Sequence, residues 1–291
     1  MISPTFQFNA DELASALGGI KPLDLLEREL SDPAEPPELA GRLTPWLGPT
    51  AGTGPAPTDL LLLEDLHLGV GYLLPGSTLR ECRTAALVGL VARQLVPPGG
   101  VTAAIVGPAR TGQALLMTVA HHMPGVRRVV LCPAEGTATV VGQWVLDEID
   151  LAGIGLSVVG IVGKAVLGAK LVVVTGEPAG QLEIGQLDRG AVVVNATGRD
   201  LPDDLVGAVE EVYVDTPALV GRGPDQNFRR IRPRIDADLG AVCRGTHSGR
   251  ANPDHVLLVE LLSANTLDIP LGCLLSRAAV DRNLGIRLGG W

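Results

Sequence analysis

The segment Val101–Gly112, VTAAIVGPARTG, constrains the fold of this chain more than any other stretch. It begins with small and β-branched residues that carry no charge, a pattern typical of a parallel strand buried on both faces. A glycine-bearing turn follows, and the next residues, QALLMTVAHHM, place apolar side chains at helical spacing. A strand, a tight turn and a helix start together predict one βα unit of a doubly wound α/β sheet.

The same turn predicts a dinucleotide site. Gly107, Ala109 and Gly112 occupy the three glycine positions of a G-x-G-x-x-G pattern, with alanine at the middle one. Backbone N–H groups at a helix N-terminus can hold a pyrophosphate, and small residues allow it to approach closely. The alternative is an ordinary βα turn that binds no ligand, and both interpretations stay open at this point.

Length and composition limit the classes of protein that fit. At 291 residues the chain exceeds one typical domain, so we expect two lobes. The formal net charge of −9 argues against a nucleic-acid partner, because basic residues are not concentrated enough to displace counterions. The cysteines lie far apart without paired spacing, so we expect neither a metal site nor a disulfide framework. They are Cys82, Cys132, Cys243 and Cys273.

The sequence predicts neither secretion nor membrane insertion. The start, MISPTFQFNADEL, lacks a basic region followed by an apolar core. Leu151–Gly176 is apolar, but Lys164 and Lys170 interrupt it, and its pattern fits two short strands joined by a small helix. A cytoplasmic enzyme is the simplest class that agrees with these observations.

Alternating strands and helices are predicted after Val101. Near the end of the chain we expect helices over Asp254–Leu262 and Leu271–Asp281, which return to the first lobe. Near its start we expect a helix over Asp11–Leu30. The predicted domains are a dinucleotide-binding Rossmann domain, 99–254, and a smaller α+β substrate and dimerisation lobe formed by 1–98 and 255–291. The expected strands of the parallel sheet are Val101–Val106, Val129–Leu131, Leu156–Val159, Leu171–Thr175, Ala191–Ala196 and Glu211–Val214.

Several phrases, in a fixed order, resemble one enzyme family. They are Arg83-Thr84-Ala85-Ala86 on a helix ahead of the glycine turn, KAVLGAKLVVVTG (Lys164–Gly176), VVVNATGRDLPDDL (Val192–Leu205), DADLGAVCRG (Asp236–Gly245) and the segment Asn252–Asp268. Together they resemble the ornithine cyclodeaminase/mu-crystallin family, from about Leu60 onward. The resemblance implies a Rossmann enzyme that uses NAD or NADP and transfers hydride at the α-carbon of an amino acid, an imino acid or a cyclic imine.

The resemblance also implies roles for individual residues. Arg83 matches the arginine that lies by the cofactor pyrophosphate and the substrate carboxylate, and its planar fork suits a pair of oxygen atoms. Asp200 matches the aspartate that exchanges a proton with the substrate amine, and no metal is implied. The expected cofactor contacts come from Arg83, Thr84, Gly107, Ala109, Arg110, Thr111, Gly112, Thr175 and Gly198.

The chain departs from the family pattern at two lysines. The proline-rich segment Thr44–Thr58 replaces a strand that carries a substrate lysine, and Val259–Ser263 replaces F-K-S-x-G, so that Glu260 stands where a lysine is usual. Two hypotheses therefore remain. The chain is an NAD(P)-dependent dehydrogenase, imine reductase or cyclodeaminase, or it is a non-catalytic relative that keeps the fold to dimerise or to bind a small ligand.

Cofactor choice and two residue roles also stay open. The second strand ends at Cys132, and only Glu135 offers a carboxylate for a ribose, while Arg110 could serve a 2′-phosphate or stack on the adenine. Arg83 could instead be a solvated helix residue, and Asp200 a turn residue paired with Arg199.

A homodimer is the last expectation. The hairpin over Leu60–Leu74 contains the run LLLL, which is too continuous for a strand with one face in water. Family members pair through this lobe, so we expect the hairpin strands to continue a sheet across a two-fold axis.

Overall fold

The computed structural model describes residues 4–32, 41–46, 59–107, 109–134, 141–176, 179–220, 231, 234–262 and 265–288. The chain divides into two units, one formed by Met1–Ala86 with Asn265–Trp291 and the other by Leu87–Ala264. Among the described residues, no helix is long and apolar enough to cross a membrane.

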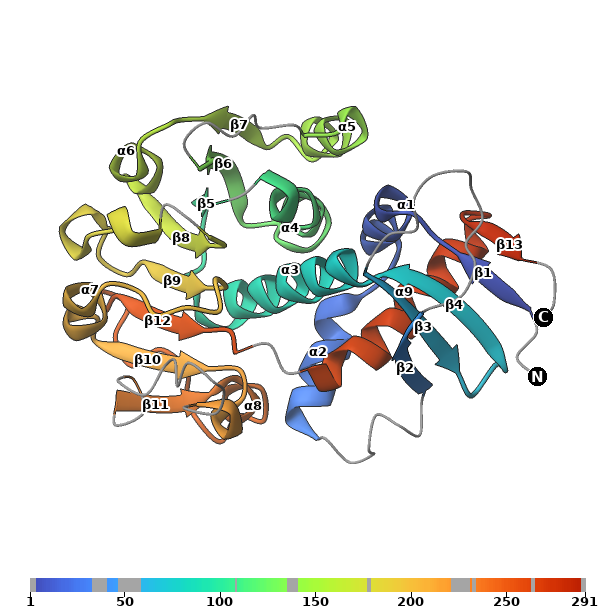
Figure 1. Ribbon diagram of the computed structural model, residues 1–291. Helices are drawn as coiled ribbons and strands as arrows, with labels where there is room; N and C mark the ends of the chain where they lie inside the picture. The colour runs from blue at the N-terminus through green and yellow to red at the C-terminus, as the bar shows by residue number, and fades with distance from the viewer. Residues whose placement is uncertain are drawn as a thin grey trace. The chain divides into compact units, whose positions relative to one another are not determined.

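The larger unit is built on a sheet of eight parallel strands (Figure 1), which confirms the predicted doubly wound α/β fold. The strand order is β11-β10-β12-β9-β8-β5-β6-β7, with the predicted strand β5 next to both β6 and β8. The bounds are β5 Val101–Val106, β6 Val126–Cys132, β7 Gly155–Val158, β8 Ala169–Val174, β9 Val192–Asn195, β10 Glu211–Val214, β11 Ile235–Asp238 and β12 Leu257–Glu260.

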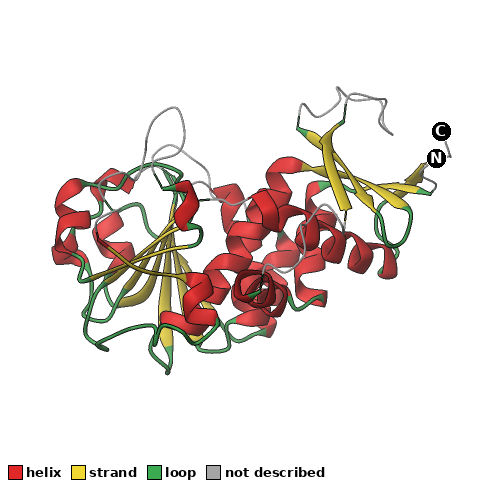
Figure 2. Ribbon diagram, turned by 90° about the horizontal axis from the view of Figure 1, so that it is seen from below, coloured by secondary structure: helices red, strands yellow, loops and turns green. Residues whose placement is uncertain are grey.

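Helices connect these strands and lie on both sides of the sheet (Figure 2). The central strands of the sheet are buried on both faces, because consecutive residues of β5, such as Ala103 and Ala104, are 1% and 0% exposed. One face packs on α6 and α7 in a single apolar core. The connecting helices are α4 Ala109–His122, α5 Gln143–Leu151, α6 Val162–Val166, α7 Asp203–Ala208 and α8 Leu239–Cys243, with short 3₁₀ turns at Ala179–Gln181, Ile184–Gln186 and Pro217–Leu219.

The helix predicted over Asp254–Leu262 is wrong. Leu257–Glu260 forms β12, which lies between β9 and β10 and is buried at every position. A short apolar run has no periodicity that separates a buried strand from a buried helix. The division of the chain consequently falls after Ala264 rather than at 254/255, and it falls after Ala86, within α3, rather than at 98/99.

The smaller unit has a mixed five-stranded sheet in the order β13-β1-β4-β3-β2. The hairpin β3–β4 forms where the sequence predicts it, with its turn over 66–69. However, β3 pairs with β2 and β4 pairs with β1, so the hairpin provides no free edge for a second subunit. The expected pairing of hairpin strands across a two-fold axis is therefore wrong, and the edges are β2 and β13. The bounds are β1 Thr5–Gln7, β2 Gly41–Pro45, β3 Leu60–Asp65, β4 Val70–Pro75 and β13 Ile286–Leu288.

Helix α9 packs on this sheet and is held to the hairpin by an ion pair. Arg277 donates from Nε and Nη2 to the two carboxylate oxygens of Asp65, at 2.6 and 2.8 Å. The helix predicted over Asp11–Leu30 is interrupted at Gly18-Gly19 and restarts at Pro22, where a proline is tolerated in a first turn. The helical bounds are α1 Ala10–Ser15, Ala16–Gly19 (3₁₀), α2 Pro22–Ser31, α3 Gly76–Leu95, Asn265–Leu267 (3₁₀) and α9 Asp268–Asp281.

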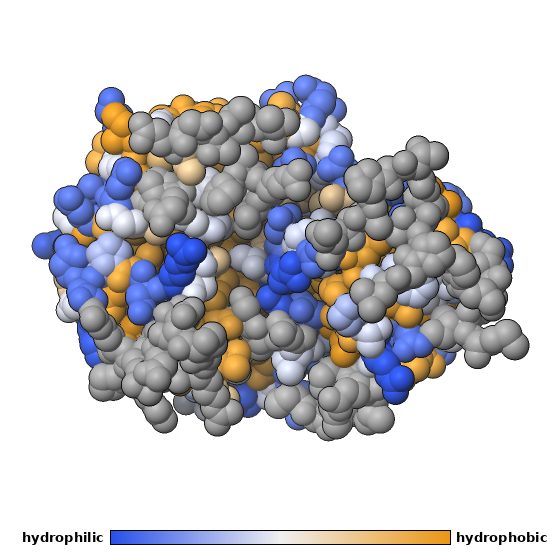
Figure 3. All heavy atoms as spheres, viewed as in Figure 1, coloured by the Kyte–Doolittle hydropathy of each residue, from blue (hydrophilic) through white to orange (hydrophobic). Residues whose placement is uncertain are grey.

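Apolar side chains also reach the surface of the larger unit near β7 and α6. In the space-filling view of Figure 3, orange spheres gather over this part of the unit. The exposed residues there are Leu151, Val158, Ile161 and Leu167.

Candidate functional site

The glycine turn after β5 has the backbone that the sequence predicts. Gly107 has φ +136°, a conformation that other residues rarely adopt, and its N–H donates to the carbonyl of Cys132 on β6 at 3.0 Å. A Cβ on Gly107 would collide with the Thr175 hydroxyl and lie 2.8 Å from the Gly176 nitrogen. The structure therefore brings Gly107 and Thr175 together at the carboxyl ends of β5 and β8, where open α/β sheets bind ligands.

Helix α4 starts directly after this turn, at Ala109. The side chains of Ala109, Arg110 and Thr111 lie outside the described residues. Gly112 is buried, yet a Cβ placed on it would meet no described heavy atom within 4 Å. No atom of β5 therefore lies within 4 Å of a Cβ placed on Gly112, although the residue is buried.

The end of β6 offers no described carboxylate for a ribose. Cys132 is 1% exposed, and burial raises the pKa of its thiol above the ordinary value. Pro133 and Ala134 are half-buried, and Glu135 lies outside the described residues.

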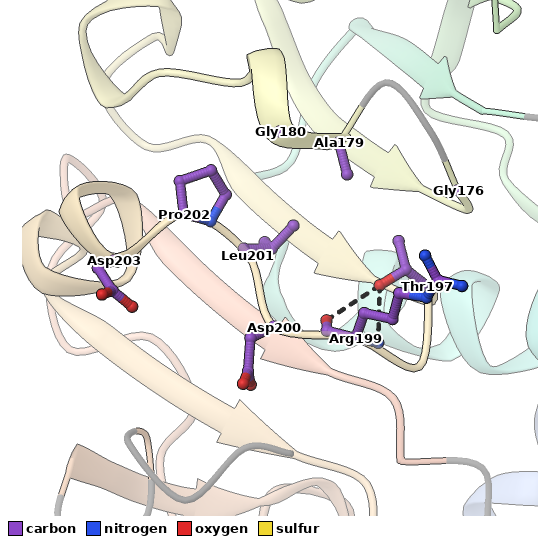
Figure 4. A pocket seen from close by; sticks show the side chains of 9 residues that line it. All are labelled: Gly176, Ala179, Gly180, Thr197, Arg199, Asp200, Leu201, Pro202 and Asp203. Atoms are coloured by element: carbon purple, nitrogen blue, oxygen red, sulfur yellow. Dashed lines mark hydrogen bonds between the residues drawn. The ribbon is translucent and has the colours of Figure 1, made fainter. Parts of the chain in front are cut away.

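A pocket of about 590 Å³ lies at the carboxyl ends of β8 and β9 (Figure 4). Gly176 and Ala179 line one side, and the segment Thr197–Asp203 lines the other. Asp200 is exposed, and Figure 4 shows its carboxylate pointing away from Ala179 and Gly180. Asp200 thus belongs to the loop that lines the pocket at the carboxyl end of β9, and its carboxylate is directed away from the wall formed by Ala179 and Gly180.

The loop that carries Asp200 is organised by Asn195, the last residue of β9. The Asn195 Oδ1 atom accepts hydrogen bonds from the Thr197 N–H at 3.1 Å and from the Thr197 hydroxyl at 2.7 Å. Its Nδ2 donates to the Arg199 carbonyl at 2.8 Å, and the Thr197 hydroxyl in turn accepts from the Arg199 N–H at 3.0 Å. Gly198, at φ +71°, makes the turn between them. Asn195 therefore fixes the path of the chain up to Asp200.

Glu260, which the sequence did not single out as a candidate site residue, contacts the loop that carries Asp200 through Asn195. It ends β12, is 1% exposed, and its Oε2 accepts the second Nδ2 hydrogen bond of Asn195 at 2.6 Å. Burial, together with the negative charges of Asp200 and Asp215, raises its pKa to about 8, although the hydrogen bond from Asn195 opposes the shift. Its position in place of a family lysine is the signal in the sequence, but that signal alone indicates only a lost positive charge.

The smaller unit contains a second charged pair. Arg83 on α3 is 2% exposed and donates from Nη1 to Asp268 Oδ1, the first residue of α9, at 2.7 Å. Burial raises the pKa of Asp268 above its ordinary value, despite the charge of Arg83 and the hydrogen bond from it. Arg83 is therefore not a solvated helix residue. Thr84 follows it on α3, half-buried.

Both residues of this pair belong to the phrases that resemble one family, and the comparison with known proteins agrees with that resemblance. The model of the ornithine cyclodeaminase/mu-crystallin family matches residues 49–269. The chain belongs to this family. The match includes Arg83, the glycine turn, Asp200, Glu260 and Asp268.

Individual members of the family are distant in sequence and similar in fold. The chain is 24% identical to Δ1-pyrroline-2-carboxylate reductase of Bacillus cereus over 243 residues, 79% of this chain and 73% of the relative. The Δ1-pyrroline-2-carboxylate reductase of Thermococcus litoralis, solved with NADH and L-proline, superimposes with a TM-score of 0.62 at 17% identity, over 79% of this chain and 74% of that one. An archaeal alanine dehydrogenase dimer with bound NAD gives a TM-score of 0.69 at 14% identity, over 99% of this chain and all of that one.

Membership of the ornithine cyclodeaminase/mu-crystallin family makes the chain an NAD(P)-dependent enzyme, either an oxidoreductase or a cyclodeaminase. The hypothesis of a non-catalytic relative is correspondingly disfavoured. The substrate and the role of each residue remain proposals.

Proposed function

We propose that the chain is an NAD(P)H-dependent reductase of an imino acid or cyclic imine, which in the reverse direction oxidises the α-carbon of the amino acid. The observation that carries the proposal is the pocket at the carboxyl ends of β8 and β9, where Asp200 lies within the same unit as the Gly107 turn. The curated relative from B. cereus, a reductase of a cyclic imino acid, supports this direction.

The described residues fit a dinucleotide. The first turn of α4 presents backbone N–H groups for a pyrophosphate, and Gly112 in that turn has no side chain to obstruct it. Gly107 lets the chain turn from β5 into α4 against Thr175, and Gly198 shapes the neighbouring loop. These residues, with Ala109, Arg110 and Thr111, would hold the cofactor, which when bound supplies a hydride to the carbon of the substrate C=N bond.

Asp200 would handle the proton in this reaction. In the reductive direction its carboxylic acid gives a proton to the substrate nitrogen, so that C=N becomes CH–NH and a carboxylate remains. In the oxidative direction the carboxylate removes a proton from the substrate ammonium and frees the nitrogen lone pair. General acid–base help of this kind contributes roughly 10²- to 10⁴-fold in rate. The family resemblance also implies that Arg83 binds the carboxylate of the substrate.

We also propose a cytoplasmic homodimer. An archaeal relative is a dimer, and the smaller unit has two strands, β2 and β13, at the edges of its sheet. A free edge can pair with a second copy across a two-fold axis.

The test is the loss of reduced-nicotinamide absorbance with Δ1-pyrroline-2-carboxylate and with imines formed from 2-oxo acids and amines. Asp200→Asn should lower kcat by about 10²- to 10⁴-fold and leave nucleotide affinity by calorimetry within a few fold. Asp204→Asn, an exposed carboxylate on α7, is the matched control and should retain activity. If Asp200→Asn lowers the Tm while turnover per folded molecule is unchanged, Asp200 is structural. If the wild type binds neither dinucleotide, the proposed function is wrong.

A further inference from the structure

Glu260 lies at an unusual place for a buried carboxyl group. It ends β12, and the neighbouring strands β9 and β10 run parallel to it on either side, with Asn195 and Val214 at its level. The Glu260 carbonyl accepts from the Asp215 N–H at 3.3 Å, which continues the pairing one residue beyond β10. The side chain is therefore enclosed at the same edge of the sheet as the pocket.

The side chain of Glu260 contacts the loop of Asp200 through Asn195. Asn195 Nδ2 has two hydrogens: one is donated to Glu260 Oε2 and the other to the Arg199 carbonyl. An amide held on both hydrogens has one orientation, and this orientation points Oδ1 at the Thr197 N–H and hydroxyl. The position of the loop thus depends on a chain of contacts that starts at Glu260.

The charged groups that face Glu260 in the described part of the chain are both acidic. Asp200 belongs to the loop after β9, and Asp215 follows β10, where its Oδ1 accepts from the Leu262 N–H at 2.8 Å. Because Asn195 is neutral, an ionised Glu260 would have two negative neighbours and no cation among these groups. A protonated Glu260 avoids this repulsion and still accepts the hydrogen bond from Asn195.

We propose that Glu260, as a neutral carboxylic acid, is a positioning residue that holds Asp200 at the pocket through Asn195 and the Thr197–Arg199 turn. Ionisation of Glu260 would push against the Asp200 carboxylate and loosen the turn. The wild-type enzyme should therefore lose kcat on the alkaline side of neutrality, as Glu260 ionises. The proposal rests on the proposed function only for the expected changes in kcat. The expected changes in hydrogen exchange do not depend on that function.

The catalytic test compares Glu260→Gln, Glu260→Ala and wild type. The comparison uses the oxidative direction, in which Asp200 acts as a carboxylate. Glutamine keeps the acceptor for Asn195 and stays neutral, so its kcat at pH 6.5 should stay within about threefold of wild type and should lack the alkaline decline. Alanine removes the acceptor, so kcat should fall by about tenfold or more while nucleotide affinity is unchanged. Equal pH profiles for wild type and Glu260→Gln, or full kcat in Glu260→Ala, would overturn the proposal.

A second buried glutamate provides the control. Glu211 starts β10, at the opposite end of the neighbouring strand, and accepts hydrogen bonds from the Tyr213 hydroxyl and the Ala251 N–H, with His255 Nδ1 at 2.7 Å. Burial opposes ionisation of Glu211, but these hydrogen bonds lower its pKa below the ordinary value. Glu211→Gln should leave the shape of the catalytic pH profile unchanged, since this group lies at the other end of the sheet. A flattened profile in Glu211→Gln would contradict a specific role for Glu260.

Hydrogen exchange gives a readout that needs no substrate. The Thr197 and Arg199 amides are protected by Asn195 Oδ1 and the Thr197 hydroxyl. After correction for the intrinsic effect of pH, exchange in the peptide over 195–203 should accelerate between pH 6.5 and 9 in wild type and not in Glu260→Gln. If this holds but no imine is turned over, the proposed function fails and the positioning network stands. If exchange is the same in both proteins, the proposed network is wrong.

Discussion

Glu260→Gln should make the stability of this protein less dependent on pH. A carboxyl group whose pKa is higher in the folded than in the unfolded state holds its proton more tightly in the folded state. The folded state therefore loses stability as the pH rises from the ordinary value of 4.5 toward about 8. Glutamine has the same shape and no ionisation, so the variant should escape this loss.

The magnitude follows from the two pKa values. Between pH 6 and pH 8 the unfolded form of Glu260 is ionised, while the folded form keeps its proton until the pH approaches 8 and is half ionised there. Wild type should therefore lose about 2 kcal/mol of unfolding free energy relative to Glu260→Gln over this range. Above about pH 9 the difference should level off, because both states are then ionised.

Urea unfolding at a series of pH values, followed by circular dichroism, measures this difference directly. The comparison needs equal m-values in the two proteins, so that only the midpoint reports stability. A difference in unfolding free energy that is constant from pH 6 to pH 9 would refute the reasoning. It would mean that Glu260 is ionised throughout and that the surrounding carboxylates do not act on it.

Three further outcomes are expected. Gly107→Val should lower the Tm and abolish nucleotide binding, because a Cβ at this position meets the Gly176 backbone at 2.8 Å. Gly112→Ala should keep the Tm and weaken nucleotide binding, as measured by calorimetry. Asp268→Asn should lower the unfolding free energy by about 3–5 kcal/mol, since it leaves the Arg83 charge buried without its carboxylate; unchanged urea midpoints would contradict this. Light scattering at micromolar concentration should give the mass of a dimer, and a monomer would exclude the proposed assembly.

The parallel sheet was largely predictable because its strands carry a strong local signal. Continuous apolar runs bounded by glycine or by helical spacing occur at β5, β8 and β9, and the structure has strands there. β12 was missed because LLVE is too short to show a period, and its strand conformation depends on pairing with β9 and β10 from earlier in the chain. Tertiary pairing of this kind cannot be read from the four residues themselves.

Only those parts of the candidate site that depend on local backbone conformation or on the end of a strand were predictable from the sequence. The Gly107 turn follows from local conformation, and the placement of Asp200 follows from the rule that ligands gather at the carboxyl ends of strands. The pair of Arg83 and Asp268 joins residues 185 positions apart, and no local pattern predicts such a contact. The raised pKa of Glu260 likewise depends on burial, which exists only once the sheet has assembled.

The position of β12 has a consequence for the order in which the chain folds. This strand is the last of its sheet in the sequence, yet it separates β9 from β10, and β10 pairs only with β12 and β11 among the described strands. During synthesis β5 to β9 can pair as they emerge, whereas β10 and β11 have no sheet to join until residues 257–260 leave the ribosome. The final step of assembly therefore inserts one strand between two others and closes the edge that carries Asp200. A nascent chain that ends before Leu257 would expose two unpaired strand edges and would be prone to aggregate.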